Sequence, residues 1–106
     1  MISCNCIVQA GQISAATEAT LRANLEAFSQ NAFGEAAHIT WREIPEGSGF
    51  TAAQPSTSSI VSMTANAPLQ QSERATLLKD MCTLWIRETN QTLDEVVGVI
   101  SDPQTA

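Results

Sequence analysis

The sequence is poor in cationic residues, and this limits the partners that the protein can bind. Five lysines and arginines stand against eleven acidic residues, which gives a formal net charge of −6. Nucleic acids and anionic membrane surfaces are bound through concentrated basic patches, so we expect neither as a partner. The five cations are instead scattered along the chain, at Arg22, Arg42, Arg74, Lys79 and Arg87.

Long apolar runs are also missing. A membrane-spanning helix needs roughly 18 to 20 consecutive apolar residues, and the sequence contains no run of that length. The segment from Met1 to Asn5 has neither the positive charge nor the apolar stretch of a secretion signal. We therefore expect a cytoplasmic protein.

Metal ligands are too few for a metal site. The chain has one histidine, His38, and three cysteines, Cys4, Cys6 and Cys82. Residues two apart on a strand point to the same side, and this spacing does not favour a disulfide between Cys4 and Cys6. No second cluster completes a four-ligand set, so we expect reduced thiols and no metal.

The hydrophobic pattern predicts two β-α-β units in one α+β domain that covers residues 1–106. A chain of 106 residues with 43% hydrophobic residues can form one core. Strands are expected at residues 2–9, 38–44, 59–65 and 96–100, and helices from Ser14 to Gly34 and downstream of Pro68. Residues 45–59 are rich in Gly, Ser, Thr and Pro and are expected to form a loop that carries Phe50.

The two halves, residues 1–50 and 58–104, resemble each other faintly. The tripeptide Ala19-Thr20-Leu21 recurs as Ala75-Thr76-Leu77, which indicates an old duplication. Right-handed crossovers would place both helices on one face of a four-stranded mixed sheet. The other face is then expected to expose a large apolar patch that partner subunits cover.

The first half resembles the short oxalocrotonate tautomerases over most of its length. The resemblance rests on the early strand, the helix that begins at Ser14 with Leu21 and Leu25, the strand that ends at Ile44, and Phe50 in a glycine-bearing loop. With the second half added, the whole chain resembles the longer, fused members of the tautomerase superfamily. These include macrophage migration inhibitory factor (MIF), malonate semialdehyde decarboxylase and the chloroacrylic acid dehalogenases.

The resemblance implies a homotrimer with active sites at the subunit boundaries. It also implies tautomerisation, hydration, dehalogenation or decarboxylation of a small carbonyl or carboxylate substrate without metal or organic cofactor. The catalytic group of that superfamily is an N-terminal proline, and Met1 occupies this place here. Ile2 is bulky and is expected to prevent removal of Met1, so a primary α-amine would remain to transfer protons or form an imine.

The arginines that hold substrate carboxylates in the family are also replaced. The loop positions before the two helices are Ile13 and Leu69, which cannot bind a carboxylate, and this favours a less anionic substrate. The family's strand arginine aligns with His38, and Arg42 lies on the same strand face. Met1, His38 and Arg42 are therefore the candidate catalytic residues.

Phe50 matches the family's aromatic residue that walls the pocket, and Ile2 and Trp41 are further candidates for its lining. Several of these assignments have a plainer alternative. A single histidine on a strand is often just half-exposed, as His38 would be, and Arg42 can pair with a nearby glutamate. Trp41, like Trp85, fits the packing of a core.

Three functions remain open on this basis. The first is a cofactor-independent keto–enol isomerase, or a related hydratase or decarboxylase, with Met1 as proton shuttle. The second is a catalytically silent, oligomeric binding or scaffold protein, for which the missing proline and arginines are the natural signature. The third is a ligand-binding or cofactor-free oxygenase domain built as a ferredoxin-like dimeric α+β barrel, which shares the β-α-β-β-α-β order of elements.

Overall fold

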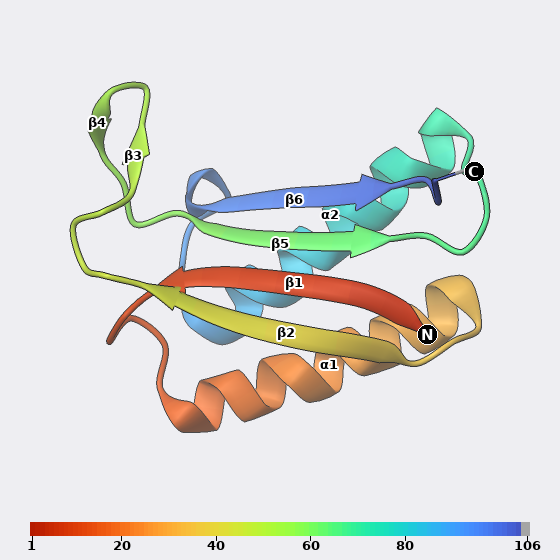
Figure 1. Cartoon of the computed structure of the whole chain (residues 1–106), viewed down its shortest axis with the longest axis horizontal. Coiled ribbons are helices and arrows are strands. Elements are labelled where there is room, and N and C mark those ends of the chain that lie inside the picture. Colours follow the sequence, from red (N-terminus) through yellow and green to blue (C-terminus); the bar gives the residue numbers. More distant parts are fainter. Residues whose placement is uncertain (105–106) are drawn as a thin grey trace.

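The computed structural model describes residues 1–104 and contains a four-stranded mixed sheet with both long helices on one side (Figure 1). The predicted α+β order is confirmed. The elements of the first unit are β1 (Ile2–Gln9), α1 (Ala15–Phe33) and β2 (Ala37–Ile44). Those of the second are β5 (Ser59–Thr64), α2 (Gln71–Thr89), the short 3-10 helix η1 (Leu93–Glu95) and β6 (Val96–Ser101).

The strand order β2-β1-β5-β6 places two parallel pairs side by side. β1 pairs with β2 and β5 with β6 in parallel, whereas β1 and β5 meet antiparallel at the centre, with Cys4 opposite Met63. This order rules out the ferredoxin-like alternative, because in a split β-α-β unit a further strand separates the two strands that a helix joins. Here α1 joins strands that are direct neighbours.

The segment between the two units differs from the expected loop. It contains a two-stranded hairpin, β3 (Phe50–Thr51) and β4 (Gln54–Pro55), which projects beyond one end of the sheet (Figure 1). Its turn residues Ala52 and Ala53 have φ angles of 52° and 63°. Sequence reasoning missed this turn because left-handed turns usually contain glycine or asparagine, and alanine adopts that conformation only at a cost.

The two helices match each other in length and in how they end. Each has 19 residues, and each is followed by a residue in the left-handed conformation, Gly34 with φ 72° and Asn90 with φ 61°. Glycine and asparagine are the residues that tolerate this position best. At the start of α1, the Ser14 hydroxyl accepts a hydrogen bond from the Thr17 N–H at 3.2 Å.

The core lies between the helices and one face of the sheet. Trp85 of α2 is fully buried and stacks on Trp41 of β2, with ring centroids 5.8 Å apart. α2 lies very close to β6, because a Cβ atom added at Gly98 would come within 2.8 Å of the Cys82 sulfur. The largest fully buried side chains include Ile2, Cys4, Cys6, Val8, Leu21, Leu25, Val61, Met63, Met81 and Trp85.

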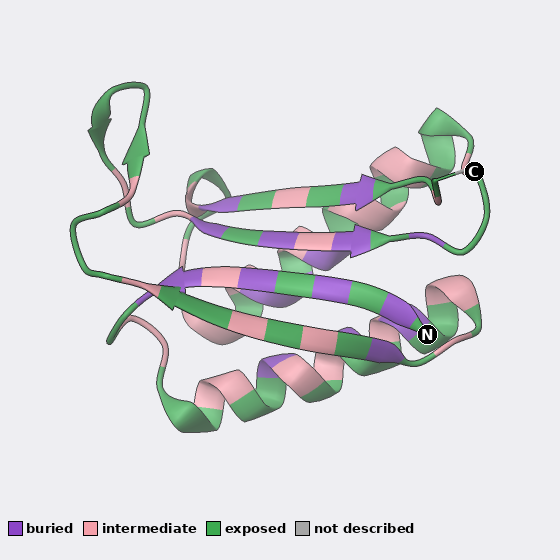
Figure 2. Cartoon of the chain, viewed as in Figure 1, coloured by how far each residue is buried: buried purple, intermediate pink, exposed green. Residues whose placement is uncertain are grey.

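The opposite face of the sheet is open, with exposed residues along all four strands (Figure 2). Its side chains are more polar than expected. Most side chains that alternate with the core positions carry a hydroxyl, amide, imidazole or guanidinium group, so the expected apolar patch is confined to part of this face. Apolar side chains gather toward one end, where Ile7 lies opposite Ile60 and Ile60 opposite Val97. The polar members of this face are Ser3, Asn5, His38, Thr40, Arg42, Ser62, Thr64 and Ser101.

Among residues 1–104, no helix combines the length and the apolar character that crossing a membrane requires.

Candidate functional site

The α-amine of Met1 lies where β1 begins, next to the turn that leads into β2 and to the residues that follow β5. It donates a hydrogen bond to Glu35 Oε1 at 2.8 Å, and the two groups form an ion pair. Asn66 Nδ2 donates to Glu35 Oε2 at 2.7 Å and to the Phe33 carbonyl at 2.8 Å. We refer to Met1, Glu35 and Asn66 as the Met1 end of the sheet.

The Met1 end is open to solvent in the single chain. Met1 is 78% exposed. The hydrogen bonds that Glu35 accepts from the Met1 ammonium and from Asn66 lower the pKa of this carboxyl below its usual value. The site therefore holds an ammonium donor directly beside an ionised carboxylate acceptor.

His38 and Arg42 both lie on the open face of β2, as the alternation of the strand predicts. His38 is opposite Ser3 and Arg42 is opposite Ile7 in the register of β1 and β2. Four residues of strand separate the two side chains by roughly 13 Å. Arg42 lines a separate hollow of about 420 Å³ on this face, together with Asn5 and Thr40. The structure thus brings His38, but not Arg42, toward the Met1 end.

Phe50 lies at the other end of the sheet from Met1 within the same chain. The hairpin follows the end of β2, whereas Met1 precedes the start of the parallel strand β1 (Figure 1). The Phe50 residue is 64% exposed. A single chain therefore does not bring Phe50 to the amine.

Ile2 and Trp41 both face the helices rather than the open side. Ile2 is 1% exposed and belongs to the core. Trp41 is half-buried between its stacking partner Trp85 and the guanidinium of Arg22, which lies 5.8 Å from the ring centroid. Their contacts within the described chain are packing contacts.

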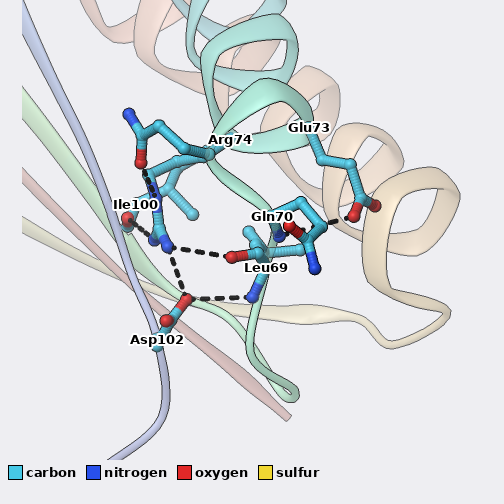
Figure 3. Close-up of polar contacts among 7 residues, drawn as sticks. Leu69, Gln70, Glu73, Arg74, Ile100 and Asp102 are labelled. Carbon is cyan, nitrogen blue, oxygen red and sulfur yellow. Dashed lines mark hydrogen bonds and ion pairs between the residues drawn. The ribbon is translucent and has the colours of Figure 1, made fainter.

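A further cation, Arg74, lies on the same side of the sheet as the Met1 end, and sequence reasoning did not place it there (Figure 3). Its guanidinium donates to the Ile100 carbonyl at 2.8 Å, to Asp102 Oδ1 at 2.9 Å and to the Leu69 carbonyl at 3.3 Å. Asp102 also accepts from the Leu69 N–H at 3.1 Å, and these bonds lower the pKa of the Asp102 carboxyl. Arg74 thus ties the start of α2 to the end of β6, and its donors are engaged by protein acceptors.

The opposite end of the sheet repeats the same plan with different groups. Gln12 Nε2 donates to the Thr57 carbonyl at 2.9 Å, and the Thr57 hydroxyl donates to Glu95 Oε2 at 2.8 Å. Hydrogen bonds from the Thr92 backbone and from Thr57 lower the pKa of the Glu95 carboxyl. We refer to Gln12, Thr57 and Glu95 as the Gln12 end.

The cysteines offer no exposed nucleophile or metal cluster. Cys4 and Cys6 are free and buried, and the Cys4 thiol together with burial raises the pKa of Cys6. Within residues 1–104, no group of three or more His, Cys, Asp or Glu side chains is arranged to hold a metal ion.

Comparisons with known proteins define the fold. No family model and no curated protein matches the sequence. The chain is similar to the solved structure of native Ps01740, with a TM-score of 0.87 and 22% identity over 95% of this chain and 93% of that one. It is also similar to a solved structure of wild-type fused 4-oxalocrotonate tautomerase (4-OT), a symmetric trimer, with a TM-score of 0.83 and 14% identity over 95% and 85% of the two chains.

A third similar structure is N1, a member of the cis-3-chloroacrylic acid dehalogenase family, with a TM-score of 0.86 and 11% identity over 95% of this chain and 74% of that one. The chain therefore has the fold of the tautomerase superfamily. More particularly, it has the fused form, in which two β-α-β units follow each other in one chain.

Proposed function

We propose that the protein is a trimeric tautomerase-superfamily enzyme that interconverts the keto and enol forms of a small carbonyl compound at the Met1 end, without a cofactor. The observation that carries this proposal is the 2.8 Å contact between the Met1 ammonium and Glu35. Keto–enol exchange needs one group to remove a proton from carbon and one to donate a proton, and this pair offers an acceptor and a donor side by side. Asn66 holds the carboxylate in place.

The pocket is completed by a neighbouring copy in this proposal. Phe50 is too exposed to act as a wall in its own chain and lies at the wrong end of the sheet. An apolar ring supplied from the next subunit would exclude water from the amine, which strengthens the electrostatic interactions inside the site. The fused 4-OT structures are trimers, which supports this arrangement. Of the two predicted catalytic side chains on β2, His38 and Arg42, His38 lies opposite Ser3 and is the nearer one to polarise the substrate carbonyl.

A catalytically silent binding protein is the second candidate. One observation favours it: the guanidinium of Arg74 at the same end is engaged by Asp102 and two carbonyls, so it is not free to hold a substrate carboxylate.

The direct test follows ketonisation of phenylenolpyruvate and 2-hydroxymuconate by ultraviolet absorbance. We expect a rate above background, and we expect Glu35→Gln to lower it by about 100-fold, the usual size of a lost acid–base group. Phe50→Ala should also lower the rate, while Phe50→Leu, which keeps an apolar wall, should retain most of it. Background rates on both substrates would favour the silent binding protein.

The role of the amine can be tested separately, because Lys79 is the single lysine in the sequence. In a Lys79→Arg variant, carbamylation by cyanate modifies only the α-amine, and intact mass confirms its site. We expect the modified protein to lose the ketonisation activity that the unmodified Lys79→Arg protein keeps. Sedimentation should give three times the chain mass; a monomer or dimer would contradict the shared pocket.

A further inference from the structure

The open face of the four-stranded sheet carries no acidic side chain, although the chain as a whole is acidic. The sequence contains eleven aspartates and glutamates. Within the four described strands of this sheet the only one is Glu43, which follows Arg42 and therefore points to the opposite side of β2. Arg42 is thus a permanent positive charge on a face without a carboxylate, and the proposed tautomerase reaction does not use it.

Arg42 begins a row of side chains that crosses the whole sheet. It lies opposite Ile7, Ile7 lies opposite Ile60, and Ile60 lies opposite Val97. Ile60 is 38% exposed and Val97 is 48% exposed. We refer to these four residues as the Arg42 row. An arginine beside exposed apolar side chains is typical of surfaces that proteins bury against one another.

The Arg42 guanidinium borders a hollow that offers hydrogen-bond donors. The hollow of about 420 Å³ is lined by Asn5, Cys6, Ile7, Thr40 and Arg42. Within residues 1–104, Arg42 forms no ion pair, and the side chains of Asn5, Thr40 and Arg42 donate no hydrogen bond. A carboxylate in this hollow would meet the planar pair of N–H donors that a guanidinium presents, with an amide and a hydroxyl beside it.

Two copies cannot satisfy Arg42 by stacking their open faces on each other. Neither face would supply a carboxylate, and a guanidinium buried at an interface without a partner is costly. The open face of one copy must therefore meet a different, carboxylate-bearing surface of the next. Contacts of this head-to-tail kind close into rings, and the fused 4-OT structures are trimers.

Suitable carboxylates lie beside the Gln12 end. Glu46 precedes the hairpin and Asp94 lies in η1, and both are exposed and form no ion pair within the described part of the chain. Each has an exposed apolar neighbour in the sequence, Phe50 at 64% exposure and Leu93 at 62%. An acid near an apolar side chain is the chemical complement of the Arg42 row.

We propose that the Arg42 row is a docking surface for a second copy of this chain, whose Glu46 or Asp94 carboxylate enters the hollow and pairs with Arg42. The apolar members of the row then cover the exposed apolar side chain that accompanies this carboxylate. This inference rests on the self-association in the proposed function, but not on ketonisation.

The test is zero-length crosslinking of the whole protein with a carbodiimide, which joins an amine to a carboxylate in contact with it. Arg42→Lys keeps the charge and supplies the amine, and a Lys79→Arg background removes the single native lysine. Unlabelled and 15N-labelled chains are unfolded together and refolded, so that a crosslink between a light and a heavy peptide identifies two copies. We expect such mixed crosslinks from residue 42 to Glu46 or Asp94. Arg87→Lys, at an exposed position of α2, is the matched control and should give none to these two carboxylates.

Sedimentation of a second set of variants measures the contribution of the pair to assembly. Arg42→Glu would place like charges against each other and should raise the dissociation constant of the assembly at least tenfold, whereas Arg42→Lys should retain most of the affinity. Arg87→Glu changes the net charge by the same amount on the helical side and should assemble like the parent chain.

The proposal is overturned if residue 42 forms no mixed crosslink, or if Arg42→Glu assembles as tightly as the parent. Acetate is the probe for a free carboxylate and should leave the Arg42 Nε–H resonance of the assembled protein unchanged. A saturable shift would show that the hollow takes small anions instead of a second copy, and would also overturn the proposal. A trimer without the crosslink could still catalyse ketonisation, and a silent trimer could still form the crosslink, so the two proposals fail separately.

Discussion

The two ends of the sheet follow one plan but carry different chemistry. At each end a carboxylate lies just before a strand, Glu35 before β2 and Glu95 before β6. At each end a side-chain amide that follows one of the two central strands donates a hydrogen bond. Asn66, after β5, donates to Glu35 at the Met1 end, and Gln12, after β1, donates to the Thr57 carbonyl at the Gln12 end. The Met1 end adds an ammonium, whereas the Gln12 end adds a threonine hydroxyl. Two β-α-β units thus supply the frame, and single side chains give each end its own chemistry.

The two ends also differ in how the helices hold them. Ser29 and Trp85 occupy the same position in helices of equal length. The Ser29 hydroxyl donates to the Glu35 carbonyl at 2.8 Å, while Trp85 Nε1 donates to Gln91 Oε1 at 2.8 Å. Gln91 Nε2 in turn donates to the Thr57 carbonyl at 3.2 Å. A small hydroxyl anchors the Met1 end, and a large buried aromatic anchors the Gln12 end.

The largest effect is expected from Trp85→Ala. It removes a fully buried ring that stacks on Trp41 and the bond to Gln91, and should lower the free energy of unfolding by about 3 to 5 kcal/mol. Urea unfolding followed by far-ultraviolet circular dichroism measures this. Trp85→Phe should recover much of the lost stability. If Trp85→Ala lowered the free energy of unfolding less than Ser29→Ala does, the role of Trp85 in holding the Gln12 end would be contradicted.

The next largest effect is expected from Gly98→Ala. Gly98 is the third residue of β6, whereas the third residue of β2 is Ile39, so this substitution tests whether α2 leaves room for a side chain on β6. The new Cβ would lie 2.8 Å from the Cys82 sulfur and 3.3 Å from the Met81 terminal carbon, so we expect a loss of about 1 to 3 kcal/mol in thermal or urea unfolding. Combining it with Cys82→Ala should reduce the added cost, because the closest atom is then gone. If Gly98→Ala lowered the stability equally in the parent chain and in the Cys82→Ala variant, the clash with the Cys82 sulfur would not be the cause.

Ser29→Ala should have a smaller effect of about 1 kcal/mol, the usual contribution of one hydrogen bond. Ser29 is fully buried, so the Glu35 carbonyl loses its donor while little volume changes. Urea unfolding gives the stability, and the Ile2 backbone amide and Asn66 side-chain resonances report on the end itself. Chemical-shift changes confined to the Gln12 end would contradict the role of Ser29 in holding the Met1 end.

The smallest effects are expected from pH. The pKa values of Glu35 and Glu95 are both lowered from the usual 4.5. A carboxyl with a lowered folded pKa stabilises the protein above its unfolded pKa, and this stabilisation disappears as the pH falls through the folded value. Melting temperatures measured from pH 7 to pH 3 should therefore fall less steeply for Glu35→Gln and Glu95→Gln than for the parent. Parallel curves would show that neither ion contributes.

Much of the fold could be predicted from the sequence because its signals are local. The helical spacing of Leu21 and Leu25, the stop at Gly34 and the alternation along β2 each depend on residues a few positions apart. The hairpin was missed because its turn contains two alanines in place of the usual glycine or asparagine. The polar open face was missed because the apolar patch was expected from the β-α-β topology alone, although the alternation of the strands already turns Ser3, Asn5 and Thr40 outward.

The candidate site was less predictable because it depends on distant contacts. Met1 and Glu35 are 34 positions apart, and Asn66 and Glu35 are 31 apart. No spacing rule connects them, and an acidic residue after a helix-ending glycine resembles many solvated loop residues. Arg74 could have been noticed from its place in the first turn of a helix, but its bond to Asp102 follows only from the sheet order.

The position of the hairpin has a consequence for mixtures of mutant chains. Since Phe50 and Met1 lie at opposite ends of one chain, a pocket built from both must draw them from different copies. Chains carrying Phe50→Ala and chains carrying Glu35→Gln, each of lowered activity alone, would then complement each other when unfolded together and refolded. A mixed assembly would contain boundaries where both partners contribute the intact residue, and the recovered activity would follow the statistics of random mixing.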